Sequence, residues 1–493
     1  MEVSQLKKKA TSAVIWNLSG TLLKQGVTFV ISIFLARLLS PEDFGLVGMA
    51  TVFIALTQSF TDFGMTSGLI QKKDPSEVQY NTVFYINMGI SLVLMFLVII
   101  FSGYIANYYN NPQVGSIARF VSYSFVLNAI NGVQLAQLTK ALANKVKTLS
   151  SLYSALATGV VGIFLAYAGY GVWSLVYATL VGSIVSTIYI WRNSSWRPKA
   201  LFDFAEVKPL LNFGSKMFAS GLLDTIYSKL DVLIIGKMFS PATLGYYFRS
   251  VSLNQLVTKY TSGALQGVFF PVVSHLQDDR EAQLRVISKS LHVISFLTFF
   301  LMGFLYLNAT EIFVILFTEK WIAAVDYFKI MVFYSYAYPI SVILVNVLSG
   351  NGYSGKFLKL EIWKKIVGLV AIAIGFYFGI IGFLWATVVS STLAVLINMV
   401  YVRKVIEWPV LKQIGVVFQY SLLSLFVTVI LVLLFDLTSL NIWASFALKT
   451  TMYTFGYFAI ARIFRTIGFR TVNGFVIKII NNKILNKNAT AAS

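Results

Sequence analysis

Cysteine is absent from this 493-residue chain, and histidine occurs only twice, at His275 and His292. The lack of cysteine excludes disulfides, thiolate metal sites and cysteine nucleophiles. Neither histidine belongs to a cluster with metal-ligand spacing, so we expect no metal site and no catalytic residues. Charged residues make up only 12% of the chain, whereas hydrophobic residues make up 57%. Soluble globular proteins of this size do not have such a composition.

Hydrophobic runs of about 20 residues, the length that crosses a bilayer core, recur along almost the whole chain. They predict an all-α polytopic membrane protein with no separate soluble domain. The first run has full length and no small-residue cleavage site follows it, so we expect no cleavable signal peptide. The predicted transmembrane helices number about fourteen, at 13–36, 44–65, 82–107, 114–138, 150–168, 171–191, 214–238, 243–268, 286–308, 323–350, 363–380, 382–402, 412–435 and 441–461.

The net charge of +20 would suggest nucleic acid as a partner in a soluble chain. Here the bases follow the predicted topology instead. With the N-terminus inside, nearly all loop bases fall on the inner connections, and only Arg37, Lys237 and Lys320 fall on the outer ones. This bias orients membrane proteins, so it predicts that both termini are cytoplasmic. We therefore expect no nucleic-acid partner.

The chain contains an internal duplication. The octapeptide at 39–46, LSPEDFGL, has a counterpart at 239–246, FSPATLGY, and each joins two hydrophobic runs. A weaker echo pairs Gly171 and Ala178-Thr179 with Gly382 and Ala386-Thr387. Six spans per copy is an even number, which predicts parallel repeats related about the membrane normal. The predicted regions are a six-helix lobe at 1–200, a second at 201–403, two added helices at 404–466 and a basic cytoplasmic tail at 467–493.

Two stretches outside the spans have amphipathic patterns. Residues 201–211 predict a short helix that lies on the inner membrane surface. The basic stretch from Gly468 to Asn488 is expected to rest on the inner leaflet as a simple anchor.

Several charges lie inside the predicted spans, where they are costly and usually face a wet interior. Lys289, Lys329 and Lys449 lie close enough to span ends to snorkel to the interface. The remaining bases are candidates for binding an anionic headgroup: Lys24, Arg119, Lys216, Lys229, Arg249 and Lys259. The acids are candidates for coupling to a proton or Na⁺, the only cofactor expected: Asp62, Asp224 and Asp231. Snorkelling remains the alternative for Arg249. A structural role, in which the side chain neutralises a neighbouring charge, remains the alternative for Lys229 and Asp231.

Polar side chains join these charges on one face of each helix concerned. At 100° per residue, Lys216, Ser220, Asp224 and Asp231 fall within about 120° on one span. Lys24 occupies the position equivalent to Asp224 in the other repeat. Such stripes predict a water-filled cleft between the lobes, and the excess of bases favours an anion such as a diphosphate. The polar candidates for the cleft wall are Asn17, Thr28, Gln58, Ser220, Ser252, Gln255 and Gln266.

Several motifs resemble one membrane-protein family. Residues 36–45, ARLLSPEDFG, resemble the signature between the first two spans of polysaccharide flippases in the multidrug/oligosaccharidyl-lipid/polysaccharide exporter superfamily. Residues 62–64 (DFG), 69–72 (LIQK) and 169–175 (GYGVWSL) are also similar. Fourteen spans are typical of the lipopolysaccharide/exopolysaccharide exporter branch, and the resemblance covers nearly the whole chain.

The resemblance implies two six-helix lobes around a central cleft, lined by spans one, two, seven and eight. It also implies a flippase in the bacterial inner membrane. By alternating access, it would move an undecaprenyl-diphosphate-linked oligosaccharide to the outer leaflet for O-antigen or exopolysaccharide synthesis. The partners implied are this lipid-linked oligosaccharide, membrane lipids and polysaccharide-assembly proteins.

Two alternatives stay open. A cation-coupled drug or metabolite exporter of the same superfamily would have an acid-dominated cleft, whereas this one has more bases. A membrane-embedded glycan polymerase or ligase would need a catalytic outer loop, but the longest outer connection, 309–323, offers only Glu311, Glu319 and Lys320.

Overall fold

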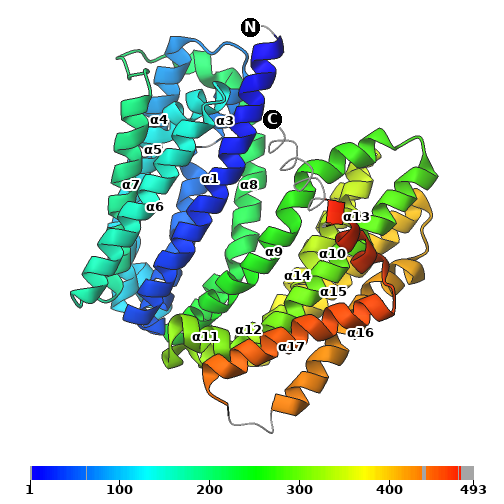
Figure 1. Cartoon of the computed structure of the whole chain (residues 1–493). Coiled ribbons are helices and arrows are strands. Elements are labelled where there is room, and N and C mark those ends of the chain that lie inside the picture. Colours follow the sequence, from blue (N-terminus) through cyan, green and yellow to red (C-terminus); the bar gives the residue numbers. More distant parts are fainter. Residues whose placement is uncertain (1–2, 63, 436–439, 476, 479–493) are drawn as a thin grey trace, which may run out of the picture. The chain divides into compact units, whose positions relative to one another are not determined.

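The computed structural model describes residues 3–62, 64–435, 440–475 and 477–478, and every named element in these ranges is a helix (Figure 1). The helices are α1 (Val3–Leu38), α2 (Pro41–Asp62), α3 (Met65–Gln71), α4 (Glu77–Tyr109), α5 (Pro112–Lys140), α6 (Asn144–Tyr167), α7 (Val172–Asn193), α8 (Phe204–Met238), α9 (Pro241–His275), α10 (Arg280–Leu307), α11 (Ala309–Phe317), the 3₁₀ helix η1 (Glu319–Trp321), α12 (Ala323–Val332), α13 (Ala337–Gly350), α14 (Ser354–Tyr377), α15 (Gly379–Ile406), α16 (Val410–Phe435) and α17 (Ile442–Ile463).

The chain divides into two compact units, Met1–Phe248 and Arg249–Ser493. We call them unit 1 and unit 2 and describe each by itself. The division falls inside α9, whereas the predicted repeat boundary lies at residue 200. A repeat boundary marks where a sequence pattern starts again, whereas the two units are defined by contacts, so the two divisions need not coincide. The predicted regions 1–200, 201–403, 404–466 and 467–493 therefore stay predictions.

Nine helical segments of the described residues are long and apolar enough to cross a membrane, so the chain is a multi-pass membrane protein. They lie in α1, α2, α4, α6, α7, α10, α12 with α13, α15 and α16.

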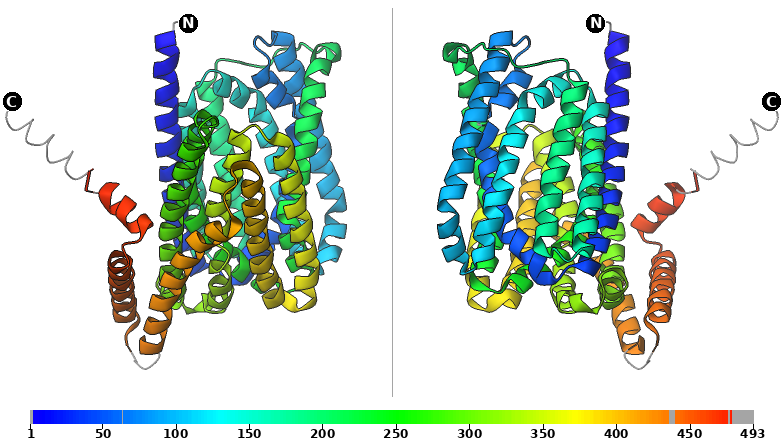
Figure 2. Two further views of the ribbon diagram at one scale, coloured as in Figure 1. Left: turned by 90° about the vertical axis from the view of Figure 1, so that its right-hand side faces the viewer. Right: turned by 90° about the vertical axis from the view of Figure 1, so that its left-hand side faces the viewer.

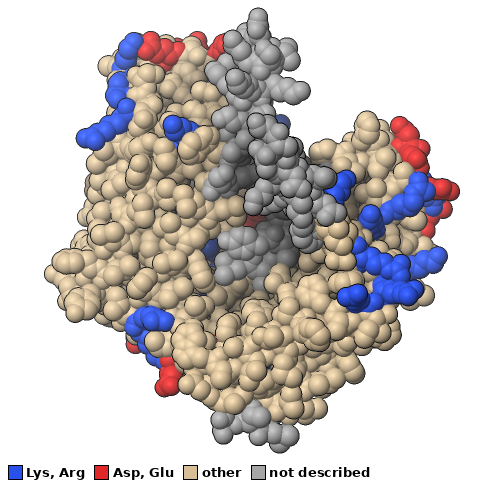
Figure 3. Space-filling model, viewed as in Figure 1, with Lys and Arg blue, Asp and Glu red and all other residues tan. Residues whose placement is uncertain are grey.

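The other five predicted spans correspond to α5, α8, α9, α14 and α17, and their crossing of the membrane stays a prediction. On the left flank of unit 1 in Figure 3, charged residues gather toward the two ends and leave a broad uncharged band between them. Such a band is what a bilayer core requires.

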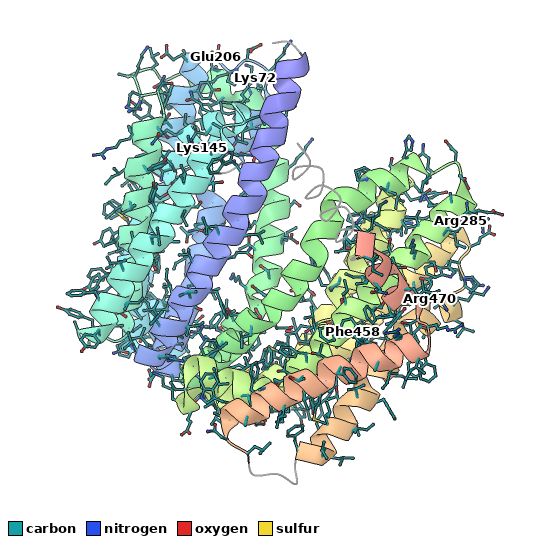
Figure 4. All side chains as sticks on the ribbon, viewed as in Figure 1. Lys72, Lys145, Glu206, Arg285, Phe458 and Arg470 are labelled. Carbon is teal, nitrogen blue, oxygen red and sulfur yellow. The ribbon has the colours of Figure 1, made fainter. Side chains whose placement is uncertain are left out.

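The local sequence explains where the helices of unit 1 begin. Ser76 caps α4 through a reciprocal capping box: its hydroxyl accepts from the Gln79 backbone N–H at 3.2 Å, and the Gln79 side chain accepts from the Ser76 N–H at 3.1 Å. The Gln79 side-chain oxygen also accepts a hydrogen bond from the Lys72 ammonium at 3.0 Å, and its Nε2 donates to the Glu206 carbonyl at 2.8 Å. Lys72 and Glu206 are labelled near one end of unit 1 in Figure 4. One side chain thus ties the starts of α4 and α8 together.

In unit 1, α4 to α7 stand side by side, as Figures 1 and 2 show from several directions. The α4–α5 and α6–α7 pairs are helical hairpins, α1 packs on α6, and α2 packs on α5 and α8. Val207 and Leu210 of α8 are buried in a core with residues of α3, α4 and α5. The expected separate surface helix at 201–211 is therefore wrong. Its residues from Phe204 onward are the first turns of α8, because the apolar side of the pattern packs against protein.

Unit 2 is organised around α10, which packs on α12, α13, α16 and α17. Tyrosines satisfy polar groups at these contacts: the Ser424 and Tyr453 hydroxyls lie 3.0 Å apart, and Tyr457 donates to the Phe296 carbonyl at 2.8 Å. Small residues allow α14 and α15 to pack closely in their hairpin, since a Cβ added at Gly375 would lie only 2.7 Å from the Ala386 Cβ. In unit 1 a Cβ on Gly162 would lie 3.3 Å from the Ala178 Cβ. Ala178 and Ala386 are the residues that the weaker sequence echo pairs.

Candidate functional site

Unit 1 carries exposed polar side chains on helices that are otherwise apolar. We call this set the polar face: Lys24 and Thr28 on α1, Gln58 on α2, and Lys216, Ser220 and Asp224 on α8, all of them exposed. The three α8 residues recur every four positions and so lie on one side of that helix. A lipid-facing position would make each charge costly. The polar face is therefore the candidate site of unit 1.

Direct contacts hold the α2 and α8 parts of the polar face together. The Ser59 and Thr225 hydroxyls lie 3.1 Å apart, so one donates to the other, and each also lies within hydrogen-bond distance of a carbonyl of its own helix. Beside them the Phe60 and Phe218 rings meet edge to face with centroids 5.1 Å apart. Ser59 and Thr225 follow Gln58 and Asp224 directly in the sequence, so this packing fixes the backbone that carries both.

The two duplicated hairpins pack against each other within unit 1. A Cβ added at Gly45 would lie 1.7 Å from the Pro241 carbonyl oxygen, and one added at Gly245 would lie 1.9 Å from the Pro41 carbonyl oxygen. Each hairpin thus presses its glycine against the first helical residue of the other. We call this pair of contacts the hairpin contact. It requires glycine on both sides, because any larger residue would collide with backbone.

Each hairpin is built in the same way. Pro41 and Pro241 begin α2 and α9, a position where a missing backbone N–H costs nothing. The preceding Ser40 and Ser240 accept from the backbone N–H three residues later, both at 3.2 Å. These caps fix the direction in which each helix begins, and so they position Gly45 and Gly245 against the opposite hairpin.

Asp231 has a defined partner. The Tyr247 hydroxyl donates to Asp231 Oδ2 at 2.5 Å, and the Val232 backbone N–H donates to Oδ1 at 2.8 Å. Lys229 is half-buried two residues earlier on α8. These contacts support the structural alternative for Asp231, since its carboxylate bridges α8 and α9.

Two further candidate bases have packing partners of their own. Arg119 of α5 is exposed and its Nε donates to the Ser102 hydroxyl of α4. Arg249 of α9 is only 6% exposed in unit 2, with its guanidinium 4.7 Å from the Phe317 ring centroid and 5.0 Å from that of Trp321. Cation–π contact in a buried setting favours a packing role for Arg249. Its placement does not support headgroup binding.

The remaining candidates divide into two groups. Ser252 and Gln255 are exposed on the α9 portion of unit 2. The side chains of Asn17, Asp62, Lys259 and Gln266 lie outside the described residues, so the structure does not place them. Among the residues described, no group of three or more histidines or acids could hold a metal ion.

The sequence did not reveal some of the strongest polar contacts. Glu311 of α11 is 5% exposed, and its Oε1 accepts from the Lys449 ammonium at 2.6 Å and from the Ser445 hydroxyl at 2.7 Å, both on α17. The Lys449 charge is therefore paired within unit 2, and its snorkelling to the interface stays a prediction. No spacing rule could have joined residues so far apart in the chain.

The fold is that of known membrane transporters. It matches "Lipid II flippase MurJ, inward closed conformation" with a TM-score of 0.74 at 17% identity, over 92% of this chain and 98% of that one. It matches an inward-facing "multidrug resistance MATE family transporter of the MOP superfamily" with a TM-score of 0.63 at 14% identity, over 78% of this chain and 94% of that one. At these identities the likeness concerns the fold alone.

The chain belongs to the family described as "Polysaccharide biosynthesis protein", which matches residues 34–326. It is 24% identical over 379 residues to "Lipopolysaccharide biosynthesis protein WzxC" of Escherichia coli (strain K12), covering 75% of this chain and 76% of the relative. It is also 24% identical over 314 residues to "Succinoglycan biosynthesis transport protein ExoT" of Rhizobium meliloti (strain 1021), covering 64% of each.

Proposed function

We propose that this chain is a flippase that moves an undecaprenyl-diphosphate-linked oligosaccharide from the cytoplasmic to the outer leaflet of a bacterial inner membrane. The product feeds surface polysaccharide synthesis, and the protein is a transporter and not an enzyme. The family match over residues 34–326 carries the proposal. Relatives named for lipopolysaccharide biosynthesis and for succinoglycan transport support it, as does the shared fold with a lipid II flippase.

In the proposed arrangement, fourteen spans form two six-helix lobes around a central cleft, followed by two added helices, with both termini cytoplasmic. The polar face lines the route of the headgroup. Lys24 and Lys216 hold the diphosphate, because ammonium groups in a low-dielectric site attract phosphate strongly. Gln58, Thr28 and Ser220 contact sugar hydroxyls. The lipid tail stays in the bilayer, where its burial costs nothing.

Alternating access needs a contact that closes the outer end and can open. The hairpin contact meets this requirement, because its close approaches join the predicted outer ends of α1–α2 and α8–α9 through glycines packed on backbone carbonyls. Of the candidate acids whose side chains the structure describes, Asp224 is the one on the polar face, so we assign coupling to a proton or Na⁺ gradient to Asp224, with Asp62 as the second candidate.

Complementation tests the proposal. The chain is expressed in a bacterium that lacks its own polysaccharide flippase but makes the cognate lipid-linked oligosaccharide. Surface glycan and cytoplasmic-face lipid-linked intermediates are measured. We expect surface glycan to return with the wild-type chain and to fall, with intermediates accumulating, in the Lys24→Ala/Lys216→Ala double variant.

Lys73→Ala serves as the matched control, since Lys73 is an exposed base in the connection after α3 and lies outside the polar face. Equal expression of all variants is verified by immunoblot. Normal glycan in the double variant would keep the flippase and discard these two residues. Failure of the wild-type chain in a strain making the cognate substrate would reject the flippase. Normal transport by Asp224→Asn at any gradient would show that Asp224 is structural.

A further inference from the structure

Unit 2 contains a long apolar groove that the transport proposal does not use. Its volume is about 560 Å³, within the range of small-molecule sites, and it is lined by α10, the end of α12 with the turn that follows it, α15 and α16. Among its lining residues are Phe299, Tyr336, Trp385, Met399, Phe418 and Leu425. Polar atoms contribute little to this lining, so the groove suits a hydrocarbon.

Hydrogen bonds tie α15 and α16 together at one end of the groove. The Gln413 amide of α16 donates to the Met399 and Trp408 carbonyls, at 3.2 and 2.8 Å, where the two helices are joined. Beyond this end the groove extends along α15 from Met399 to Trp385. At 1.5 Å per residue, that is about 20 Å. One leaflet of hydrocarbon is about 15 Å thick, so a chain reaching from headgroup depth to the bilayer midplane fits lengthwise.

Two polar side chains in the groove wall are already engaged within the protein. The Tyr336 hydroxyl donates to Thr392 Oγ1 at 2.8 Å, and the Ser424 hydroxyl donates to the Phe299 carbonyl at 2.8 Å. They therefore hold neighbouring helices together. A sugar placed among the apolar side chains of this lining would lose its hydration without gaining equivalent partners from them.

A base stands at the joined end of the groove. Val388, Thr392, Val395 and Met399 line it from one side of α15, and Arg403 continues that side one turn further. Arg403 is exposed and directly follows the predicted span 382–402, which places it at headgroup depth. Lys404 is also exposed, but it is turned about 100° away from the groove side of α15.

We propose that this groove binds an anionic membrane phospholipid, with one acyl chain between α15 and α16 and the phosphate at Arg403. The apolar groove suits the acyl chain of such a lipid, and the base at headgroup level suits its phosphate. The length of the groove matches one ordinary acyl chain, which favours a phospholipid over a long polyprenyl carrier. The lipid is bound whether or not the chain is a flippase.

Native mass spectrometry of the delipidated full-length chain in detergent tests the occupant. Phosphatidylglycerol and phosphatidylcholine of the same chain length are titrated in turn. We expect a one-lipid adduct with phosphatidylglycerol and weaker binding of phosphatidylcholine. Ser421→Phe, which fills the groove from α16, abolishes the adduct, whereas its neighbour Leu422→Phe, on the exposed side, retains it. Thermal unfolding confirms that both variants are folded.

The charge is tested separately. Arg403→Gln weakens phosphatidylglycerol binding about fivefold, the effect of one base near an anionic surface, and leaves phosphatidylcholine binding unchanged. Lys404→Gln changes neither. Equal binding of both lipids, an adduct that survives in folded Ser421→Phe, or equal effects of the two base variants would overturn the proposal. Displacement of phosphatidylglycerol by an equimolar polyprenyl phosphate would assign the groove to the carrier lipid and would also overturn it.

Discussion

At the scale of single residues, the Glu311–Lys449 pair is the clearest case of a charge made tolerable by its surroundings. Its side chains are only 6% and 17% exposed, and it joins α11 to α17. Removing one partner of a buried pair costs about 3–5 kcal/mol, because the other charge is left without compensation. Glu311→Gln should therefore lower the midpoint of thermal unfolding of the detergent-solubilised chain clearly.

The control for that measurement is Glu407→Gln, because the ion pair of Glu407 with Arg280 is exposed and such pairs contribute little. The double variant Glu311→Gln/Lys449→Gln should be less damaged than the sum of the two single changes predicts. Strict additivity would show that the two charges do not stabilise each other.

The same pair predicts a pH dependence. Burial alone would raise the pKa of Glu311, but hydrogen bonds from Lys449 and Ser445 outweigh it and hold the pKa below its ordinary value. The stabilisation is thus fully present above the unfolded-state pKa of about 4.3 and is lost as pH falls through the lower folded-state value. The difference in unfolding midpoint between wild type and Glu311→Gln should shrink between pH 7 and about 3.5. A constant difference would contradict this.

The expectations for single side chains relied on helical phase, that is, on which side of a helix each residue lies, and helical phase gives no information on contacts with distant segments. Phase correctly gathers polar residues on one side of a helix, and it placed Lys216, Ser220 and Asp224 on a common exposed side of α8. It cannot distinguish a wet surface from a pocket built by distant aromatic rings. Arg249 shows this, since Phe317 and Trp321 cover it from a segment some 70 residues away.

At the scale of elements, the hairpin contact makes a direct prediction. Gly45→Ala would force the Pro241 carbonyl away, so the two hairpins should separate. The chain has no native cysteine, so spin labels at Glu42→Cys and Ala242→Cys report the hairpin spacing without background. Pulsed dipolar spectroscopy should show longer distances in Gly45→Ala. Gly221→Ala is the control, because a Cβ there meets nothing within 4 Å. An unchanged distance distribution in Gly45→Ala would reject the contact.

Most helices could be predicted from the length of the hydrophobic runs, because an apolar run of about 20 residues has few alternatives to a transmembrane helix. The break between α12 and α13 could not, since residues 323–350 form one apolar run. There the Ser335 hydroxyl donates to the side chain of Asn254 on α9, and Asn254 donates to the Met331 carbonyl at 3.3 Å. A contact between distant segments accompanies the break, and the sequence pattern carries no trace of it.

At the scale of the whole molecule, the asymmetric distribution of bases predicts orientation. A single cysteine at Glu319→Cys should react with a membrane-impermeant maleimide in intact spheroplasts. A single cysteine at Lys73→Cys should react only after permeabilisation. Both positions are exposed, so access to the reagent decides the result. The reverse pattern would place the termini outside, and labelling of both in intact cells would contradict the predicted alternation of spans.

The hairpin contact has a consequence for how the two repeats can change. In a symmetric homodimer, an isologous interface pairs residue i of one subunit with j of the other, and j with i. The pairs Gly45–Pro241 and Gly245–Pro41 follow the same rule inside a single polypeptide. A mutation in a homodimer gene would alter both halves of such an interface at once. Here each half has its own codons, so selection can weaken one side of the joint while keeping the other intact.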